Sequence, residues 1–309
     1  MEIVKHRYMF FLLSLIIIIP GMIAWAVWGM PLSHDFTGGS MLDIKFDAGK
    51  APTPTEIMAV YDSLNIPDPY VQTSENDVRI IRSKYMDEET KDKVLAELKT
   101  KFNSNIEILQ FETVGPTIGK EIASRAAITV ALASIGILLY ITWAFRGIPN
   151  AFRYGTSAII AMLHDVLVIL GFGAIFGHFL GWEVDTLFLT AVLTVIGYSV
   201  NDTVVIFDRI RENSHILRNL PYEKVVNHSI VQTFNRSLKT SFTVMLTLLA
   251  LMLFGGVSIY RFAAILFIGI LSGTYSSIFN AAMILVVWEN REWNNWFKPK
   301  KKTDEVVAA

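Results

Sequence analysis

Long apolar stretches alternate with short polar ones along the chain, and this pattern predicts most of the architecture. A helix of about 20 residues crosses a hydrocarbon core of about 30 Å. Six stretches meet this requirement: Tyr8–Trp28, Ala126–Phe145, Tyr154–Phe176, Leu187–Phe207, Ser237–Phe254 and Phe262–Trp288. The sequence therefore predicts a polytopic α-helical membrane protein with six transmembrane helices.

The stretch at residues 29–125 has the composition of a small soluble domain. Alternating apolar residues predict strands at Ser40–Phe46, Tyr70–Thr73, Asp77–Arg82 and Ile106–Val114, with a turn at Ser74-Glu75-Asn76. Helices are expected at Thr55–Asn65, after Pro54, and at Asp87–Asn103, whose acidic first turn suits the helix dipole. The order βαββαβ is that of a small α+β ferredoxin-like domain. This fold hosts many functions and by itself indicates none of them.

Composition agrees with a membrane protein and narrows the chemistry. The chain is 52% hydrophobic and only 18% charged, with a mean hydropathy of +0.44. It has no cysteine, which excludes disulfides and thiolate metal sites. We see no spacing typical of a metal cluster, a nucleotide-binding loop or a catalytic triad. The sequence therefore predicts no cofactor, no metal, no enzymatic activity and no nucleic-acid partner.

The distribution of Lys and Arg predicts the orientation. Basic residues gather before the first stretch, between the second and third, between the fourth and fifth, and in the tail: Lys5, Arg7, Arg146, Arg153, Arg209, Arg211, Arg218, Lys224, Arg236, Lys239, Arg291, Lys298, Lys300, Lys301 and Lys302. The positive-inside rule then puts both termini in the cytoplasm, with a cytoplasmic loop at 208–236 and a basic tail at 291–309 beside membrane lipids. The domain at 29–125 falls on the outer side.

The first stretch has two interpretations. Lys5-His6-Arg7 before an apolar run, with Ala24-Trp25-Ala26 at its end, is typical of a cleaved signal peptide. The run is longer than a usual signal peptide, and Trp25 and Trp28 suit the membrane interface. These two features favour a retained helix at residues 1–28, followed by a five-helix region at 126–290.

Polar residues inside the apolar stretches are the candidate functional groups. Asn201 and Asp202 lie in the fourth stretch after Gly197, and His164 and Asp165 lie in the third. A carboxylate in hydrocarbon costs at least a few kcal/mol, so it usually faces a protein interior or a water path and marks a functional site. Arg236 stands where the fifth stretch begins. The amphipathic segment Pro221–Phe234 before it is expected to lie along the inner membrane surface.

This constellation suits proton handling. Burial favours the neutral acid and a nearby guanidinium favours the carboxylate, so an aspartate that alternates between the two binds and releases a proton. We expect Asp202 to carry the proton, Arg236 to switch it, and Asn201, Ser199 and Thr203 to supply hydrogen bonds. The alternative is that Asp202 and Arg236 form a static ion pair that fixes helix register. His164 and Asp165 are expected to form either a second relay or an interhelical hydrogen bond.

A short glycine motif follows the first stretch. Asp35-Phe36-Thr37-Gly38-Gly39-Ser40 is expected to make a tight connection into the first strand, because glycine adopts backbone conformations barred to other residues. Asp35, Gly38 and Gly39, like Gly197, are thus expected to be structural. The alternative is a loop at the outer mouth that admits water or ions.

Several motifs resemble a known family. Asp35–Ser40 (DFTGGS), Glu112–Pro116 (ETVGP), Leu163-His164-Asp165, Gly197–Asn213 (GYSVNDTVVIFDRIREN) and Gly273–Ser277 (GTYSS) are similar to the SecF members of the SecD/SecF family of bacterial protein-export subunits. The match runs in order over nearly the whole chain. His34 departs from it, because that position is usually small or aliphatic, and Phe234-Asn235 replaces the usual Leu-Ser before the arginine.

The resemblance implies a function and partners. It implies a bacterial inner-membrane protein of the resistance-nodulation-division superfamily with a periplasmic domain, which pairs with SecD and uses the proton-motive force. It would assist preproteins beside the SecYEG channel and the motor SecA. It also implies roles in proton movement for Asp202 and Arg236.

Two other classes of function stay open. One is half of a small-molecule or lipid exporter of the same superfamily. The other is an intramembrane aspartyl protease that uses Asp165 and Asp202, a chemistry that needs the two carboxyl groups in contact.

Overall fold

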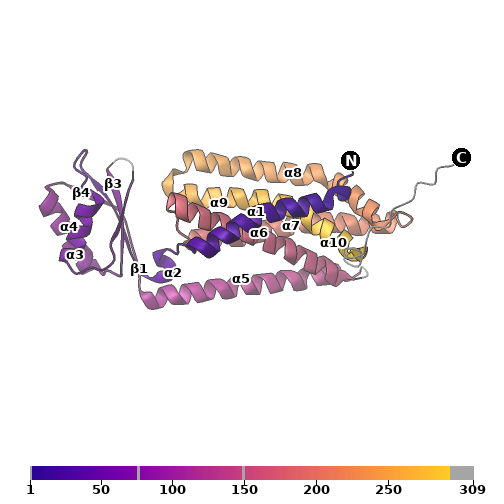
Figure 1. The fold of residues 1–309 in the computed structure, drawn as a ribbon, viewed down its shortest axis with the longest axis horizontal. Helices are drawn as coiled ribbons and strands as arrows, with labels where there is room; N and C mark the ends of the chain where they lie inside the picture. The colour runs from indigo at the N-terminus through magenta and orange to yellow at the C-terminus, as the bar shows by residue number, and fades with distance from the viewer. Residues whose placement is uncertain (1, 75–76, 148–149, 293–309) are drawn as a thin grey trace. The chain divides into compact units, whose positions relative to one another are not determined.

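The computed structural model describes residues 2–74, 77–147 and 150–292, in two compact units. The helical unit comprises Met1–Gly29, Leu132–Ile175 and Thr190–Ala309, and the sheet unit comprises Met30–Ala131 and Phe176–Leu189. Figure 1 shows the long helices of the first and the β-sheet of the second. The predicted turn at Ser74-Glu75-Asn76 lies partly outside the described residues, as does the basic tail beyond residue 292.

The part of the chain that the structure describes has six helical segments long and apolar enough to span a membrane, as the sequence predicts. The first is the 3₁₀ turn η1 (Val4–His6) with α1 (Arg7–Trp28). The next four are α5 (Pro116–Ala144), α6 (Ala151–Leu180), α7 (Thr186–Ile216) and α8 (Tyr222–Phe254). The sixth joins α9 (Gly256–Ser276), the π-helical turn η2 (Ser277–Ala281) and α10 (Ala282–Glu289).

The helices extend further than hydropathy alone predicts. Helix α5 begins ten residues before the predicted start, because Pro116 suits the first turn of a helix. Helix α7 continues past the apolar stretch to Ile216, and α8 begins at Tyr222. Most of the segment at 208–236 is therefore helical, with residues 217–221 as the connection between the two helices; its place on the cytoplasmic side stays a prediction.

The segment Pro221–Phe234 is also placed differently from the prediction. It is the first part of α8, and Val225, Val226 and Ile230 are buried in the helical unit. The Asn213 amide donates to Ser229 Oγ at 2.9 Å, which ties the end of α7 to this part of α8. An apolar stripe is expected both for a helix on the membrane surface and for a helix packed in the protein. Here the stripe packs against residues of α7.

The sheet unit contains a four-stranded sheet with the order β2-β3-β1-β4. Its elements are β1 (Gly39–Phe46), α3 (Pro54–Ser63), β2 (Tyr70–Thr73), β3 (Val78–Ser83), α4 (Glu88–Phe102) and β4 (Ile106–Val114), in the predicted order. All strand pairs are antiparallel. Both helices lie on one face of the sheet (Figure 1), where Leu42, Ile44 and Ile81 pack against Ile57 and Leu98.

Side-chain caps begin both helices of the sheet unit. Thr53 and Glu56 form a capping box at α3, and Asp87 accepts a hydrogen bond of 2.9 Å from the Thr90 amide at α4. Hydrogen bonds from Thr90 hold the pKa of the Asp87 carboxyl below its ordinary value, and those from Thr53 do the same for Glu56. Asp87 is thus the cap of α4 and not a residue of its first turn.

Candidate functional site

One face of α7 carries the polar residues of the candidate site. Ser199, Asp202 and Thr203 are buried on the face that also buries Ile206 and Phe207, as the spacing i, i+3, i+4 requires. Asn201 and Gly197 are exposed on another side of the helix. The structure shows Asn201 exposed while Asp202 is buried, so a hydrogen bond from Asn201 to Asp202 stays a prediction.

Asp165 is surrounded by hydrogen-bond donors. Its side chain on α6 is fully buried. Oδ2 accepts from Ser199 Oγ and from Ser276 Oγ, both at 2.6 Å. Oδ1 accepts from Ser272 Oγ at 2.7 Å and lies 3.0 Å from His164 Nδ1. A carboxylate has about four acceptor sites, so these contacts satisfy it. The side chain ties α6 to α7 and α9.

Close packing brings these helices together. A side chain at Gly269 would lie 2.3 Å from Val195 of α7, and one at Gly273 would lie 3.2 Å from Ser199. Glycines at this spacing on α9 let its backbone approach α7. A side chain at Gly273 would also lie 3.6 Å from Asp165 Oδ2, so this glycine leaves room for the carboxylate beside α9.

Asp202 has far fewer partners. Its Oδ1 accepts a hydrogen bond of 2.6 Å from Ser237 Oγ of α8. Its Oδ2 is buried and, among the residues that the structure describes, has no hydrogen-bond partner. A buried polar atom without a partner costs free energy, so Oδ2 marks a place where a proton or water molecule would be stabilised.

A short polar chain links the surroundings of the two acids. Thr203, next to Asp202, lies within hydrogen-bond distance of Ser277 at 2.8 Å. Ser277 donates to the backbone oxygen of Ser199 at 3.0 Å, and Ser199 donates to Asp165. None of the described contacts joins the two carboxyl groups to each other. The geometry thus lacks the shared proton that an aspartyl protease requires.

Arg236 lies beside a cavity at the end of α7. The cavity has a volume of about 410 Å³ and is lined by Asp208, Arg209, Arg211, Glu212 and Arg236, among others. Arg209 pairs with Glu212 at 2.7 Å and Arg211 with Asp208 at 2.8 Å. Arg236 is exposed and forms no ion pair with Asp202 in the described part of the chain. A static Asp202–Arg236 pair is therefore not what this conformation contains.

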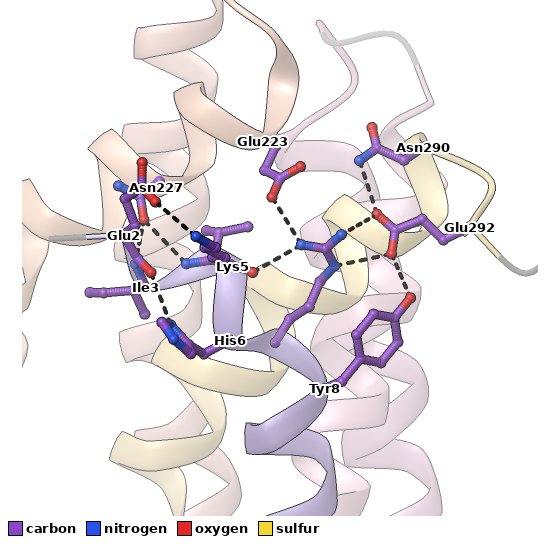
Figure 2. Close-up of polar contacts among 11 residues, drawn as sticks. Glu2, Ile3, Lys5, His6, Tyr8, Glu223, Asn227, Asn290 and Glu292 are labelled. Carbon is purple, nitrogen blue, oxygen red and sulfur yellow. Dashed lines mark hydrogen bonds and ion pairs between the residues drawn. The ribbon is translucent and has the colours of Figure 1, made fainter. Parts of the chain in front are cut away.

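A second charged cluster links the start of α1 to the start of α8 and to the residues that follow α10 (Figure 2). Arg7 donates to Glu292 at 3.0 and 2.8 Å and to Glu223 of α8 at 2.9 Å. Tyr8 donates to Glu292 at 2.6 Å. Burial by itself raises the pKa of Glu292, but the hydrogen bonds from Tyr8 and Arg7 outweigh it and lower the pKa below its ordinary value. Asn227 accepts from the Ile3 and Val4 amides at 2.7 and 3.2 Å.

The glycine motif occupies the sheet unit. Gly38 has a φ of +75°, and a side chain there would lie 2.6 Å from the backbone of Pro116 at the start of α5. Gly39 has a φ of +141°. Asp35 Oδ2 accepts hydrogen bonds from the Thr186 amide and hydroxyl, both at 2.9 Å, at the start of α7. Gly38 and Gly39 thus adopt backbone conformations that favour glycine, and the Asp35 carboxylate caps the start of α7.

The sequence alone did not predict one further group. His34, Asp35 and Glu112 bring an imidazole and two carboxylates together, with one atom of each within 4.8 Å of the others. The one sequence feature that could have drawn attention to this group is His34, at a position expected to be small or aliphatic in the family. Its nearness to Glu112, 78 residues away along the chain, follows only from the fold.

Six membrane-length helices with buried polar groups define a multi-pass helical membrane protein. A family model described as "Protein export membrane protein SecD/SecF, C-terminal" matches residues 93–291. The chain belongs to this SecD/SecF family. The comparison with curated relatives agrees: the protein translocase subunit SecF of Anaerolinea thermophila is 53% identical over 299 residues, which cover 96% of this chain and 97% of the relative.

Longer proteins match as well. The protein translocase subunit SecDF of Bacillus subtilis is 36% identical over a region that covers 93% of this chain and 38% of the longer protein. The crystal structure of SecDF from Thermus thermophilus, described as a translocon-associated membrane protein, superimposes with a TM-score of 0.81 at 30% identity. That match covers 94% of this chain and 39% of the SecDF chain.

Proposed function

We propose that the chain is an accessory subunit of bacterial protein export that acts together with a SecD protein. Relatives of nearly the same length are named protein translocase subunit SecF. In SecDF the matching region is part of a longer single chain, which supports a separate SecD partner for this one. No finding favours the exporter alternative.

The coupling site in this proposal is Asp202. The observation that supports it most is the buried Oδ2 without a partner, on a helix that ends at a cavity lined by Arg236. A carboxyl group held by one hydroxyl can take up a proton without breaking a network. The Arg236 side chain is exposed and forms no ion pair with Asp202 in this conformation. Its length would let the guanidinium approach the Asp202 carboxyl when the helices rearrange. One proton that crosses 100 mV releases about 2.3 kcal/mol, enough to bias a conformational equilibrium.

The other predicted relay residues take different roles in the proposal. His164 and Asp165 belong to the interhelical hydrogen-bond network that holds α6, α7 and α9 together beside Asp202. Asn201 is exposed on α7 in the single chain, so in a complex it would face the partner and not Asp202.

The proposal also assigns an orientation. We place the chain in the inner membrane with both termini in the cytoplasm, a retained first helix at 1–28, a ferredoxin-like periplasmic domain at 29–125, a five-helix region at 126–290 and a cytoplasmic tail at 291–309. The sheet order β2-β3-β1-β4 and the order of elements support the ferredoxin-like assignment. Its proposed partners besides SecD are the SecYEG channel, the motor SecA, the emerging preprotein and membrane lipids.

Reconstituted export tests the proposal. The chain is purified with SecD and placed in proteoliposomes with SecYEG and SecA, and pH and sodium gradients are imposed separately. We expect stimulation of preprotein translocation that needs both subunits and the pH gradient. Failure of the chain to co-purify with SecD, or equal translocation without any gradient, would contradict it.

A further inference from the structure

Three side chains of the sheet unit converge on one point. His34 and Asp35 come from α2 (His34–Thr37), and Glu112 comes from β4. His34 Nε2 lies 3.3 Å from Glu112 Oε2 and 3.6 Å from Asp35 Oδ1. Imidazole nitrogen and carboxylate oxygen are common ligands of Zn²⁺.

The separations between the ligand atoms also suit metal coordination. His34 Nε2 lies within hydrogen-bond distance of Glu112 Oε2, whereas its 3.6 Å separation from Asp35 Oδ1 is too long for a hydrogen bond. Tetrahedral Zn²⁺ with bonds of about 2.0–2.1 Å keeps its ligand atoms about 3.3–3.4 Å apart. The His34–Glu112 separation matches this value, the His34–Asp35 separation is slightly longer, and the three ligand atoms all lie within 4.8 Å of one another.

Each carboxylate is already held from behind. Asp35 uses Oδ2 to accept from Thr186, which leaves Oδ1 toward His34. Glu112 uses Oε1 to accept from Gln110 Nε2 at 2.7 Å, which leaves Oε2 toward His34. Such outer hydrogen bonds orient the ligands of metal sites.

The charge of the group is not balanced by a basic side chain. In the described residues, neither Asp35 nor Glu112 forms an ion pair with Lys or Arg. The His34 side chain is 9% exposed, and its Nδ1 has no partner among these residues, so the two carboxylates are its polar contacts. A divalent cation would neutralise both carboxylates.

We propose that His34, Asp35 and Glu112 bind one divalent transition-metal ion of the Zn²⁺ class. The imidazole selects against Mg²⁺ and Ca²⁺, which prefer oxygen ligands. Glu112 is 46% exposed, so the fourth coordination position is open to water. The ion would cross-link α2 to β4 (Figure 1), the segments through which the chain enters and leaves the sheet.

Metal binding by the full chain tests this site. The protein is purified in detergent without a polyhistidine tag, and Zn²⁺ alone is titrated by calorimetry, with bound metal counted by mass spectrometry. Co²⁺ is then substituted and its visible absorption recorded. We expect one ion per chain, the absorption of tetrahedral Co²⁺, and a higher unfolding temperature with Zn²⁺.

Variants distinguish this site from other metal-binding groups. His34→Ala and Glu112→Gln should each weaken Zn²⁺ binding at least about tenfold. Exposed His178→Ala and Glu107→Gln, the latter on the same strand as Glu112, should bind as the wild type does. Asp35→Ala is avoided because Asp35 also caps α7. Unfolding curves without metal show whether each variant folds.

Two results would overturn the assignment. One is a wild-type chain that binds less than one Zn²⁺. The other is a folded His34→Ala chain that binds Zn²⁺ as tightly as the wild type. Neither result bears on export, which the reconstitution above tests separately.

Discussion

Asp165 and Asp202 are both buried acids within membrane-spanning helices, yet their surroundings differ. Asp165 is fully buried and contacts four polar side chains from three helices. Asp202 is 9% exposed and has one hydroxyl partner, while its second oxygen has none in the described chain. Both acids are buried inside the helical unit, but only Asp165 has its hydrogen-bonding capacity filled.

Under the proposed function, this difference gives the two acids different roles, with Asp165 holding helices together and Asp202 changing its protonation state. A satisfied carboxylate holds its helices in one arrangement, because any movement breaks several hydrogen bonds at once. A carboxylate with a free oxygen changes protonation state or partner with little rearrangement. We therefore expect mutations at Asp165 to change stability, and mutations at Asp202 to change coupling.

The largest expected change in stability is that of Asp165→Ala. The substitution leaves two buried serine hydroxyls, the half-buried Ser272 hydroxyl and the His164 ring without their acceptor, and it should lower the free energy of unfolding by about 3–5 kcal/mol. Ser157→Ala is the matched control, since Ser157 is buried on the same helix and its hydroxyl has no described partner. Chemical unfolding in micelles, followed by tryptophan fluorescence, measures both. If the Asp165→Ala chain were as stable as the control, Asp165 would not stabilise the packing of these helices.

The largest expected change in coupling is that of Asp202→Asn. The amide keeps the size of the side chain and an acceptor for Ser237, so stability should change by less than about 1 kcal/mol. The proton-dependent stimulation of export should disappear, because the amide does not carry the proton. Asp62→Asn, the same exchange at an exposed position of α3 in the sheet unit, should export as the wild type does. Normal export by Asp202→Asn would remove Asp202 from the coupling site.

A smaller effect is expected for Ser237→Ala, which removes the hydroxyl partner of Asp202. The loss of this hydrogen bond should cost about 1 kcal/mol of stability, and export should persist because Asp202 remains. Thr240→Ala on the same helix is the control, since the Thr240 hydroxyl bonds only to its own helix, at Arg236. Complete loss of export in Ser237→Ala would mean that the hydroxyl belongs to the relay itself.

The smallest effect concerns a carboxylate outside the membrane. Because folding lowers the pKa of Asp87, its cap stabilises α4 above the ordinary pKa of aspartate, and this stabilisation is lost as the pH falls through the lowered value. The protection of the first α4 amides in the full chain, corrected for the intrinsic pH dependence of amide exchange, should therefore fall in acid. Asp87→Asn keeps a capping side chain but does not titrate, so its exchange should lack this step. Identical pH profiles for both chains would refute the role of the cap.

The sequence predicts the regular elements well because each has a clear period. The strand at Ile106–Val114 is confirmed, and the described residues contain the predicted six helices long and apolar enough to span a membrane. The error at Pro221–Phe234 has a physical cause: an apolar stripe indicates burial but does not say whether lipid or protein covers it. The polar end of α7 gave no hydropathy signal, so its extension over that stripe was not foreseen.

The site was predicted in its residues but not in its contacts. A charged residue in an apolar stretch identifies Asp165 and Asp202 directly. Which serines point at Asp165 depends on how α9 packs against α7, and a periodicity argument does not contain that information. In the same way, the helical phase that exposes Asn201 becomes clear only when the buried side of α7 is known.

The π turn Ser277–Ala281 has a consequence for the last helix. A wider turn accommodates one extra residue, and one residue in an α-helix corresponds to a rotation of about 100°. With the turn in place, Met283 and Val286 of α10 point into the protein. Removing a single residue from this turn would rotate the apolar face of α10 away from the protein interior. The packing of α10 therefore depends on a π turn, although π turns are rare in helices.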